Sequence, residues 1–161
     1  AVLEGGASNV GVESTIIDVA HGAPRLLRPG GIPREAIEQA LGQPLLDAAH
    51  ATDVRAPGML ESHYAPRAGL LLVSADELPD AVRPHADKKL VVIAGASVKV
   101  PAGATHLAVP DDAAGFARVL YASLRVADTL GELIFAVPPP ESGLGLAVRD
   151  RLRRAAAPRP R

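Results

Sequence analysis

The 161-residue sequence contains no cysteine and no tryptophan, and aromatic residues make up only 2% of it. Without cysteine the chain forms neither disulfides nor thiolate metal sites, which is typical of a cytosolic protein. With so few aromatic side chains it offers no platform on which nucleic-acid bases would stack. The formal net charge of −1 gives no overall electrostatic attraction to nucleic acid either.

Long apolar runs are also missing, since none approaches the roughly 20 residues of a membrane span. No basic-then-apolar leader opens the chain. Hydrophobic residues nevertheless make up 48% of the sequence, which is enough for a core. The first six residues, Ala-Val-Leu-Glu-Gly-Gly, predict a strand that runs into a turn. Because the chain opens in mid-strand, we expect it to be the later part of a larger protein.

The stretch Gly11-Val-Glu-Ser-Thr-Ile-Ile-Asp18 predicts a tight turn that enters a β-strand. Glycine permits the turn, and threonine and isoleucine favour an extended chain. A His-Gly-Ala-Pro turn at residues 21–24 and a return strand over residues 25–28 follow, and Pro29-Gly30-Gly31 ends that strand. The pattern therefore predicts a β-hairpin.

Two polar side chains stand at defined places on this hairpin. Ser14 offers a hydroxyl beside the glycine turn, and Arg28 offers a guanidinium fork that suits a carboxylate or a phosphate. A serine and an arginine on adjacent strands more often have a structural role. Taken alone, the hairpin leaves both interpretations open.

After the hairpin a short helix is predicted to begin near Pro33, to carry Ile37 and Leu41 on one face and to stop at Gly42. Residues 1–46 are too few to bury a core by themselves. We therefore expect them to be the end of a larger sheet domain.

Residues 47–67 are polar and Ala-rich, and Pro-Gly and Ala-Pro steps interrupt them, so we interpret them as a linker. Residues 68–157 then alternate between apolar runs and helical patterns, and a tail at 158–161 is expected to fray. Strands are predicted at 70–73, 90–94, 106–109 and 132–137. A first helix is predicted at 75–82 with Ser74 as its cap, a second from Asp111 or Asp112 to Gly131, and a third from Gly145 to about Ala156. This alternation predicts a three-layer α/β/α domain of Rossmann-like form with a mostly parallel sheet.

Four motifs, in this order, resemble one family: GVESTIID at 11–18, LLRPGGI at 26–32, SHYAP at 62–66 and GLGLAVRDRLRRAA at 143–156. The sequence is similar to the long, two-domain form of threonylcarbamoyl-AMP synthase, a YrdC/YciO-like family. The resemblance covers nearly the whole chain. It implies that residues 1–46 are the C-terminal remnant of a YrdC-like α+β twisted-sheet domain, and that 47–67 form a lid linker before the C-terminal domain at 68–157.

The resemblance implies that the complete enzyme is a nucleotidyltransferase, which condenses ATP, L-threonine and bicarbonate to threonylcarbamoyl-AMP and pyrophosphate with the help of Mg²⁺. The product is used for threonylcarbamoyladenosine modification of tRNA in the cytoplasm. Other proteins perform the transfer to tRNA. The resemblance implies that Ser14 lies in the L-threonine pocket and that Arg28 meets the ATP phosphates. It also implies that the linker with His63 and Tyr64 closes over ATP, and it leaves open which of the two contacts the nucleotide.

His63, Tyr64 and the glycine turn at 143–145 also have interpretations that do not depend on the family. A packed linker, with His63 hydrogen-bonded and Tyr64 filling a gap, is the less favoured alternative to the lid, and a metal-binding role for His63 is disfavoured because no second ligand lies at metal spacing. Gly143 and Gly145 precede a helix but lack a third glycine and do not follow the first strand, so a packing turn is favoured over a phosphate loop.

The last helix ends in four arginines, at positions 149, 151, 153 and 154. A solvated helix face with cations near the C-terminus is the default interpretation. Contact with tRNA phosphates or with a partner in tRNA modification is the weaker alternative.

The family also carries K-x-R and S-x-N motifs upstream of the matched region, and neither motif occurs in residues 1–161. We therefore expect half a pocket and no activity from this chain alone. The competing hypothesis is a non-catalytic docking or regulatory α/β module. A generic nucleotide-binding domain at 68–157 is disfavoured, because that segment has no convincing phosphate loop.

Overall fold

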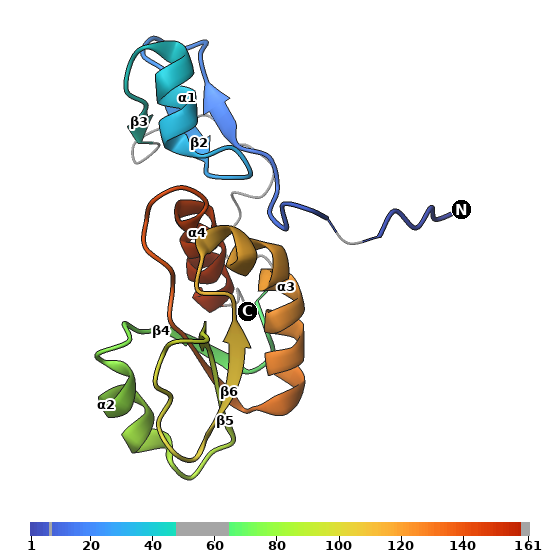
Figure 1. The fold of residues 1–161 in the computed structure, drawn as a ribbon, viewed down its shortest axis with the longest axis vertical. Helices are drawn as coiled ribbons and strands as arrows, with labels where there is room; N and C mark the ends of the chain where they lie inside the picture. The colour runs from blue at the N-terminus through green and yellow to red at the C-terminus, as the bar shows by residue number, and fades with distance from the viewer. Residues whose placement is uncertain (7, 48–64, 159–161) are drawn as a thin grey trace.

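The computed structural model describes residues 1–6, 8–47 and 65–158. Within these ranges the strands form two sheets (Figure 1), one with the order β1-β2-β3 and one with the order β4-β7-β5-β6. No helix in the described part of the chain is long and apolar enough to cross a membrane.

The first sheet contains the predicted hairpin. Strand β1 (Ile16–Asp18) pairs antiparallel with β2 (Arg25–Arg28). Helix α1 (Arg34–Leu41) follows and ends at Gly42, whose left-handed φ of 66° fits the predicted stop. Strand β3 (Leu46–Asp47) then pairs parallel with β2, a pairing that the sequence did not predict because a two-residue strand leaves no periodic pattern.

The predicted strand at residues 1–6 is wrong. These residues are exposed and have no strand assignment. A strand needs a hydrogen-bonding partner, and the three-stranded sheet runs from β1 to β3 without including them. Without a neighbouring strand, residues 1–6 adopt no strand conformation in the structure.

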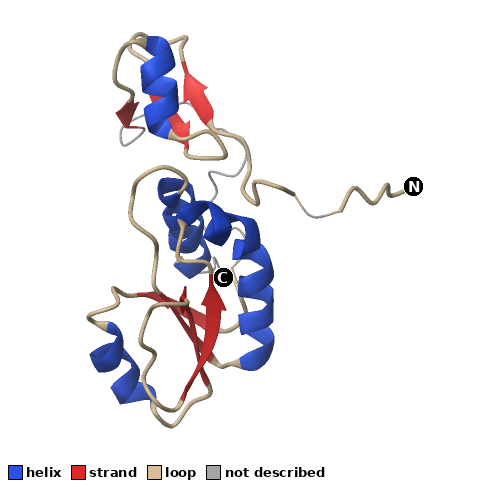
Figure 2. Cartoon of the chain, viewed as in Figure 1, coloured by secondary structure: helices blue, strands red, loops and turns tan. Residues whose placement is uncertain are grey.

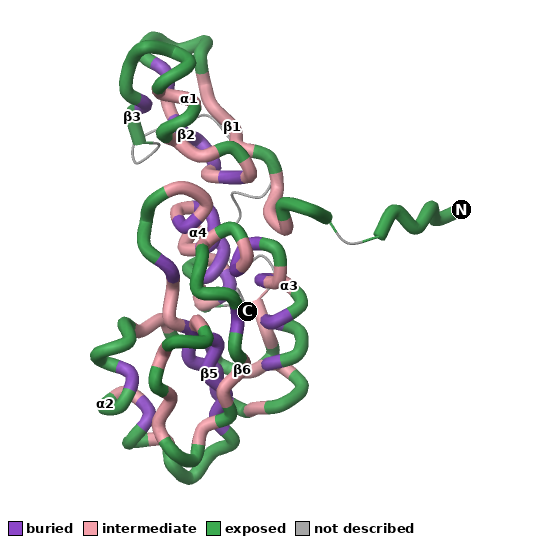
Figure 3. Tube along the Cα trace, viewed as in Figure 1, coloured by how far each residue is buried: buried purple, intermediate pink, exposed green. Residues whose placement is uncertain are grey.

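The second sheet confirms the four strands predicted for the rest of the chain. They are β4 (Gly69–Leu72), β5 (Leu90–Gly95), β6 (Ala104–Val109) and β7 (Leu133–Ala136). All three pairings between them are parallel. The four residues of β7 are all buried, as expected of a strand that is covered on both faces. The first five residues of β5 are buried too, and Figure 3 shows buried chain, in purple, beside the β5 label.

Four helical segments connect or follow these strands: α2 (Leu78–Val82), a 3₁₀ turn η1 (Arg83–His85), α3 (Ala113–Leu130) and α4 (Gly145–Ala156). The caps follow local chemistry. The Ser74 and Glu77 side chains bond each other's backbone N–H groups, as in a capping box, and α2 begins directly after them. The Asp112 side chain accepts from Gly115 N at 2.7 Å and caps α3, which confirms one of the two predicted caps.

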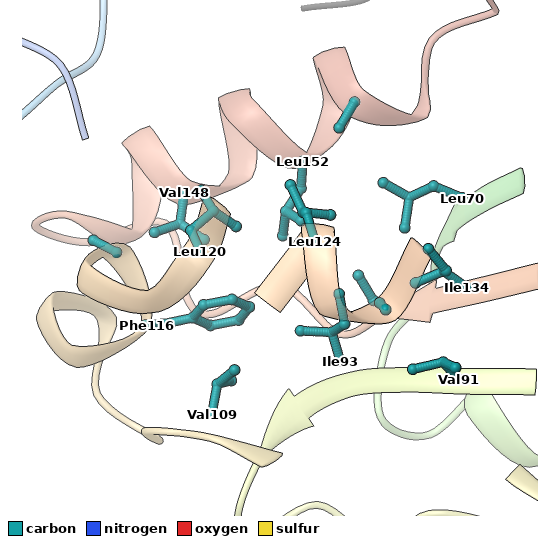
Figure 4. Packing of buried hydrophobic residues seen from close by; sticks show 14 residues of the cluster. Leu70, Val91, Ile93, Val109, Phe116, Leu120, Leu124, Ile134, Val148 and Leu152 are labelled. Carbon is teal, nitrogen blue, oxygen red and sulfur yellow. The ribbon is translucent and has the colours of Figure 1, made fainter. Parts of the chain in front are cut away.

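Helices cover both faces of the second sheet and make three layers (Figure 2). On one face α3 and α4 bury a cluster that includes Phe116, Leu120 and Leu152 against β5 and β7 (Figure 4). On the other face α2 contributes Leu78 and Val82, which pack with Phe135. The predicted α/β architecture with a parallel sheet is confirmed for this part of the chain, whereas the domain and linker boundaries stay predictions.

Candidate functional site

The two hairpin side chains selected from the sequence lie together. Arg28 is 8% exposed. Its Nε and Nη2 donate to the backbone oxygen of Ser14 at 3.1 and 2.9 Å, and Nη2 also donates to Ser14 Oγ at 3.2 Å. A buried, charged fork thus holds both the main chain and the hydroxyl of the exposed Ser14.

This geometry has a chemical consequence for the Ser14 hydroxyl. Because its oxygen accepts from a guanidinium, its own O–H is directed elsewhere and is suited to donate to an anion. An exposed hydroxyl beside a fixed positive charge is a reasonable receptor for a carboxylate. The arrangement can therefore orient a small acid beside Ser14, two residues before β1 begins.

The glycine turn after β2 also holds the backbone around Ser14 in place. A Cβ on Gly30 would stand 2.3 Å from the Ser14 carbonyl carbon, so only glycine fits there. Gly31 N donates to the Glu13 carbonyl at 2.8 Å, and the Thr15 hydroxyl exchanges hydrogen bonds with the backbone of Ile32. The GVEST and RPGGI motifs are therefore two halves of one local structure.

The opposite side of the segment lies against α3. Gly11 has a φ of 79°, and a Cβ on it would meet the Ala117 carbonyl oxygen at 2.2 Å. Val12 packs against the core cluster under α3 and α4, and Arg118 donates to the Asn9 carbonyl at 3.0 Å. Residues of the hairpin and of the second sheet's helices thus contact each other directly.

Glu13, between Val12 and Ser14, joins both helices through its side chain. Tyr121 of α3 donates its O–H to the carboxylate at 2.9 Å to Oε1 and 3.0 Å to Oε2. Arg151 of α4 donates from Nε to Oε2 at 2.8 Å. Arg151 is 4% exposed and also pairs with Asp150, while its Nη2 is buried with no hydrogen-bond partner among the described residues.

The electrostatics of this cluster reflect its burial. Burial raises the pKa of Glu13, but the hydrogen bond from Arg151, a backbone hydrogen bond, the hydrogen bond from Tyr121 and the charge of Arg151 together outweigh burial and hold that pKa below its ordinary value. Burial and the neighbouring Glu13 carboxylate raise the pKa of Tyr121. Burial lowers the pKa of Arg151, but the hydrogen bond and charge of Glu13, with further contributions from Asp150 and Tyr121, raise that pKa above its ordinary value.

The default interpretation of the arginine-rich helix end is wrong for Arg151. It is buried rather than solvated, because it shares the apolar face of α4 with Val148, Leu152 and Ala155. The spacing 148, 151, 152, 155 is the signal that would have revealed it. Sequence reasoning likewise missed Glu13 and Tyr121. Arg153, in contrast, has a side chain that is 57% exposed and fits the default.

His63 and Tyr64, the residues expected to contact ATP, lie outside the described residues. Within the described part, no group of three or more His, Asp or Glu side chains is arranged to hold a metal ion. The predicted packing role of the glycine turn before α4 agrees with its geometry, since a Cβ on Gly145 would stand 1.8 Å from the Pro140 carbonyl oxygen.

A separate cavity of about 530 Å³ opens where β4 and β7 end, lined by residues that include Ser74, Val137, Arg149 and Arg153. Glu141 Oε1 lies 3.1 Å from Arg149 Nε and 2.9 Å from Arg153 Nη2, so the two arginines in the cavity wall share one carboxylate. The hairpin site is the better candidate for a functional site, because its Arg28 is buried and holds the exposed Ser14 hydroxyl in a fixed orientation.

Comparison with known proteins defines the family. Residues 32–157 match the family model described as "Threonylcarbamoyl-AMP synthase, C-terminal domain". The chain therefore belongs to this family, as the four motifs suggested.

Curated relatives extend the match over most of the chain. The threonylcarbamoyl-AMP synthase of Pyrococcus abyssi is 36% identical over 96% of the chain and 48% of its own length, and that of Bacillus subtilis is 32% identical over 98% and 49%. The chain thus spans about half the length of the curated relatives it matches.

Solved structures agree with the fold. The crystal structure of P. abyssi Sua5 complexed with L-threonine matches with a TM-score of 0.78 and 36% identity, over 95% of this chain and 48% of that one. A second structure is a variant of the same protein in which an adjacent histidine and tyrosine are replaced by alanine, with a TM-score of 0.76 and 34% identity.

Proposed function

We propose that this chain is the C-terminal portion of an L-threonylcarbamoyladenylate synthase and carries one wall of its substrate pocket. The complete reaction consumes ATP, L-threonine and bicarbonate, and yields threonylcarbamoyl-AMP, pyrophosphate and water. The product serves threonylcarbamoyladenosine modification of tRNA in the cytoplasm. The observation that carries the proposal is the buried Arg28 fork on Ser14, within a chain of this family.

The chemistry suits these two residues. Threonine must first become a carbamate, whose oxygen then attacks the α-phosphate of ATP while pyrophosphate leaves. In our proposal the Ser14 hydroxyl donates to the carboxylate or the carbamate of threonine and so orients the nucleophile. The fixed charge of Arg28 helps to balance the negative charge that develops on the phosphates. Mg²⁺ would accompany ATP.

In this proposal the linker at residues 47–67 supplies further contacts to ATP. The sequence has one adjacent histidine–tyrosine pair, His63-Tyr64, and the P. abyssi variant with such a pair replaced supports it as the pair to test. A segment that closes over ATP excludes water, which protects a reactive adenylate from hydrolysis.

The test is pyrophosphate release with ATP, L-threonine, bicarbonate and Mg²⁺. The chain is assayed alone, and then with the upstream half of the P. abyssi relative, which we expect to supply the family's K-x-R and S-x-N motifs. We expect turnover only in the second case, and we expect Arg28→Ala to abolish it. Arg125→Ala, an exposed arginine of α3, is the matched control. Silence in both cases from a folded chain would overturn the proposal.

A non-catalytic docking or regulatory module is the second candidate. The observation in its favour is that the second sheet has a hydrophobic core on each of its faces. No residue of β1, β2 or β3 belongs to either core cluster. It predicts that the chain stays inactive with any upstream half while residues 65–158 still fold.

A further inference from the structure

Glu13 connects the proposed threonine-binding segment to helices that lie more than one hundred residues further along the chain. It directly precedes Ser14, and its carboxylate is held by Tyr121 of α3 and by Arg151 of α4. We propose that Arg151, with Tyr121, is a positioning residue that sets the place of Ser14 through Glu13. The part of the proposal that concerns threonine rests on the proposed function.

The burial of Arg151 shows that the pair is more than a surface contact. The Arg151 side chain is 4% exposed, and that of Glu13 is 33% exposed. A buried guanidinium requires an acidic partner, because an unpaired charge away from water is strongly unfavourable. Its other partner, Asp150, also accepts two hydrogen bonds from Arg154. Glu13 therefore satisfies a charge that α4 cannot satisfy by itself.

The connection to Ser14 is short and stiff. The carbonyl of Glu13 accepts from Gly31 N at 2.8 Å, and the next carbonyl, that of Ser14, accepts from Arg28. The backbone between these two carbonyls has little freedom once both are held. Residues 13–15 and the hairpin therefore move as one unit, so a displacement of Glu13 from α3 and α4 carries the Ser14 hydroxyl with it, and a displacement of about 1 Å at a positioning group is enough to impair a reaction.

The two sides of the segment have separate tasks in this arrangement. Arg28 and the glycine turn hold the backbone of residues 13–15 within the hairpin. Arg151 and Tyr121 fix where that hairpin stands relative to α3 and α4. This gives the second sheet's helices a role in the synthase reaction without any contact to substrate.

The first test is hydrogen exchange of the chain itself, in Arg151→Met, Glu13→Gln and Tyr121→Phe. Arg153→Met is the matched control, since Arg153 lies on the same helix, pairs with Glu141 and has a 57% exposed side chain. We expect the amides of residues 14–17 to exchange about tenfold faster in Arg151→Met and Glu13→Gln, and less so in Tyr121→Phe. Amides of β5 should keep their protection in every variant.

A purely structural role gives a different pattern. Exchange that rises equally at residues 14–17 and at β5 would mean general destabilisation and would overturn the proposal. Unchanged exchange at residues 14–17 would overturn it too. If Arg151→Met does not fold, Glu13→Gln and Tyr121→Phe decide the question in the same way, because each removes hydrogen bonds with little change in shape.

The second test is kinetic and uses the synthase completed with the upstream half. We expect Arg151→Met to raise the KM for L-threonine about tenfold with the KM for ATP unchanged, and Arg151→Lys, which keeps the charge, to restore part of the loss. Equal KM values for L-threonine in Arg151→Met and Arg153→Met would refute the positioning role. If the completed wild type releases no pyrophosphate, the proposed function fails and the exchange experiment alone decides the positioning.

Discussion

Gly11 lies so close to α3 that a Cβ on it would stand 2.2 Å from the carbonyl oxygen of Ala117. The contact brings backbone against backbone, so neither side can yield by changing a rotamer. It is also what allows Val12 and Glu13, the next two residues, to reach the helices.

Gly11→Ala should therefore detach the segment from α3. Gly22→Ala is the matched control, because Gly22 also has a positive φ, of 87°, but a Cβ on it would meet nothing within 4 Å. The backbone strain alone is expected to cost about 1–2 kcal/mol in the control. Gly11→Ala should cost about 1–3 kcal/mol more, through the clash. Urea unfolding followed at residues 11–18 measures the loss of unfolding free energy in each variant. Equal losses in Gly11→Ala and Gly22→Ala would contradict the prediction.

Arg28→Ala is predicted to loosen the hairpin as well as to remove a charge from the site. The variant leaves the carbonyl of Ser14 without its guanidinium donor, and a hydrogen bond to a charged group contributes about 1.5–3 kcal/mol. Exchange of β1 and β2 amides should therefore rise, whereas the β5 amides should not. Arg125→Ala, which changes an exposed arginine, should alter neither.

The sequence predicted the second sheet almost completely, because its signals are local. Buried parallel strands appear as apolar runs such as Leu90–Gly95, and α3 carries a full apolar face with an acidic cap. The antiparallel hairpin was likewise predicted correctly from its glycine and proline turns. Its motifs also led to Ser14 and Arg28, whose side chains lie in contact.

The cluster of Glu13, Tyr121 and Arg151 was missed for a physical reason. Glu13 is 108 positions from Tyr121 and 138 positions from Arg151, and no local pattern records which side chains meet after folding. Arg151 offered the one usable signal, since a charged residue on the apolar face of a helix needs a buried partner. The partner itself followed only from the structure.

Leu120 and Leu130 allow the contribution of the second sheet's core to stability to be measured. Leu120 is fully buried under α4, and Leu130, on the same helix, is 47% exposed. Leu120→Ala should lower the free energy of unfolding by about 2–5 kcal/mol, and Leu130→Ala by much less. If residues 65–158 form their own domain, a fragment of these residues should unfold cooperatively and show the same two losses by circular dichroism in urea.

Acid should weaken the ion pair of Glu13 in a defined range. Its pKa is lower in the folded chain than the ordinary value of 4.5, so the folded state binds fewer protons in that range. The stabilisation is complete above pH 4.5 and is lost as the pH falls through the folded-state pKa. Other carboxylates with lowered pKa values, such as Asp128 and Glu38, add the same trend in every variant. The difference in unfolding free energy between wild type and Glu13→Gln therefore isolates Glu13, and it should shrink below pH 4.5.

Alkali should act on the same cluster through Tyr121. Burial and the nearby Glu13 carboxylate raise the Tyr121 pKa above its ordinary value of 10.0, so the folded chain keeps a phenol proton that the unfolded chain releases near pH 10.0. The stabilisation is therefore complete below pH 10.0 and declines as the pH rises above it. Tyr121→Phe carries no such proton, and the wild type should lose its stability advantage over this variant above pH 10.0 in thermal unfolding. An advantage that stays constant to pH 11 would mean that the Tyr121 hydroxyl is not held by Glu13 in solution.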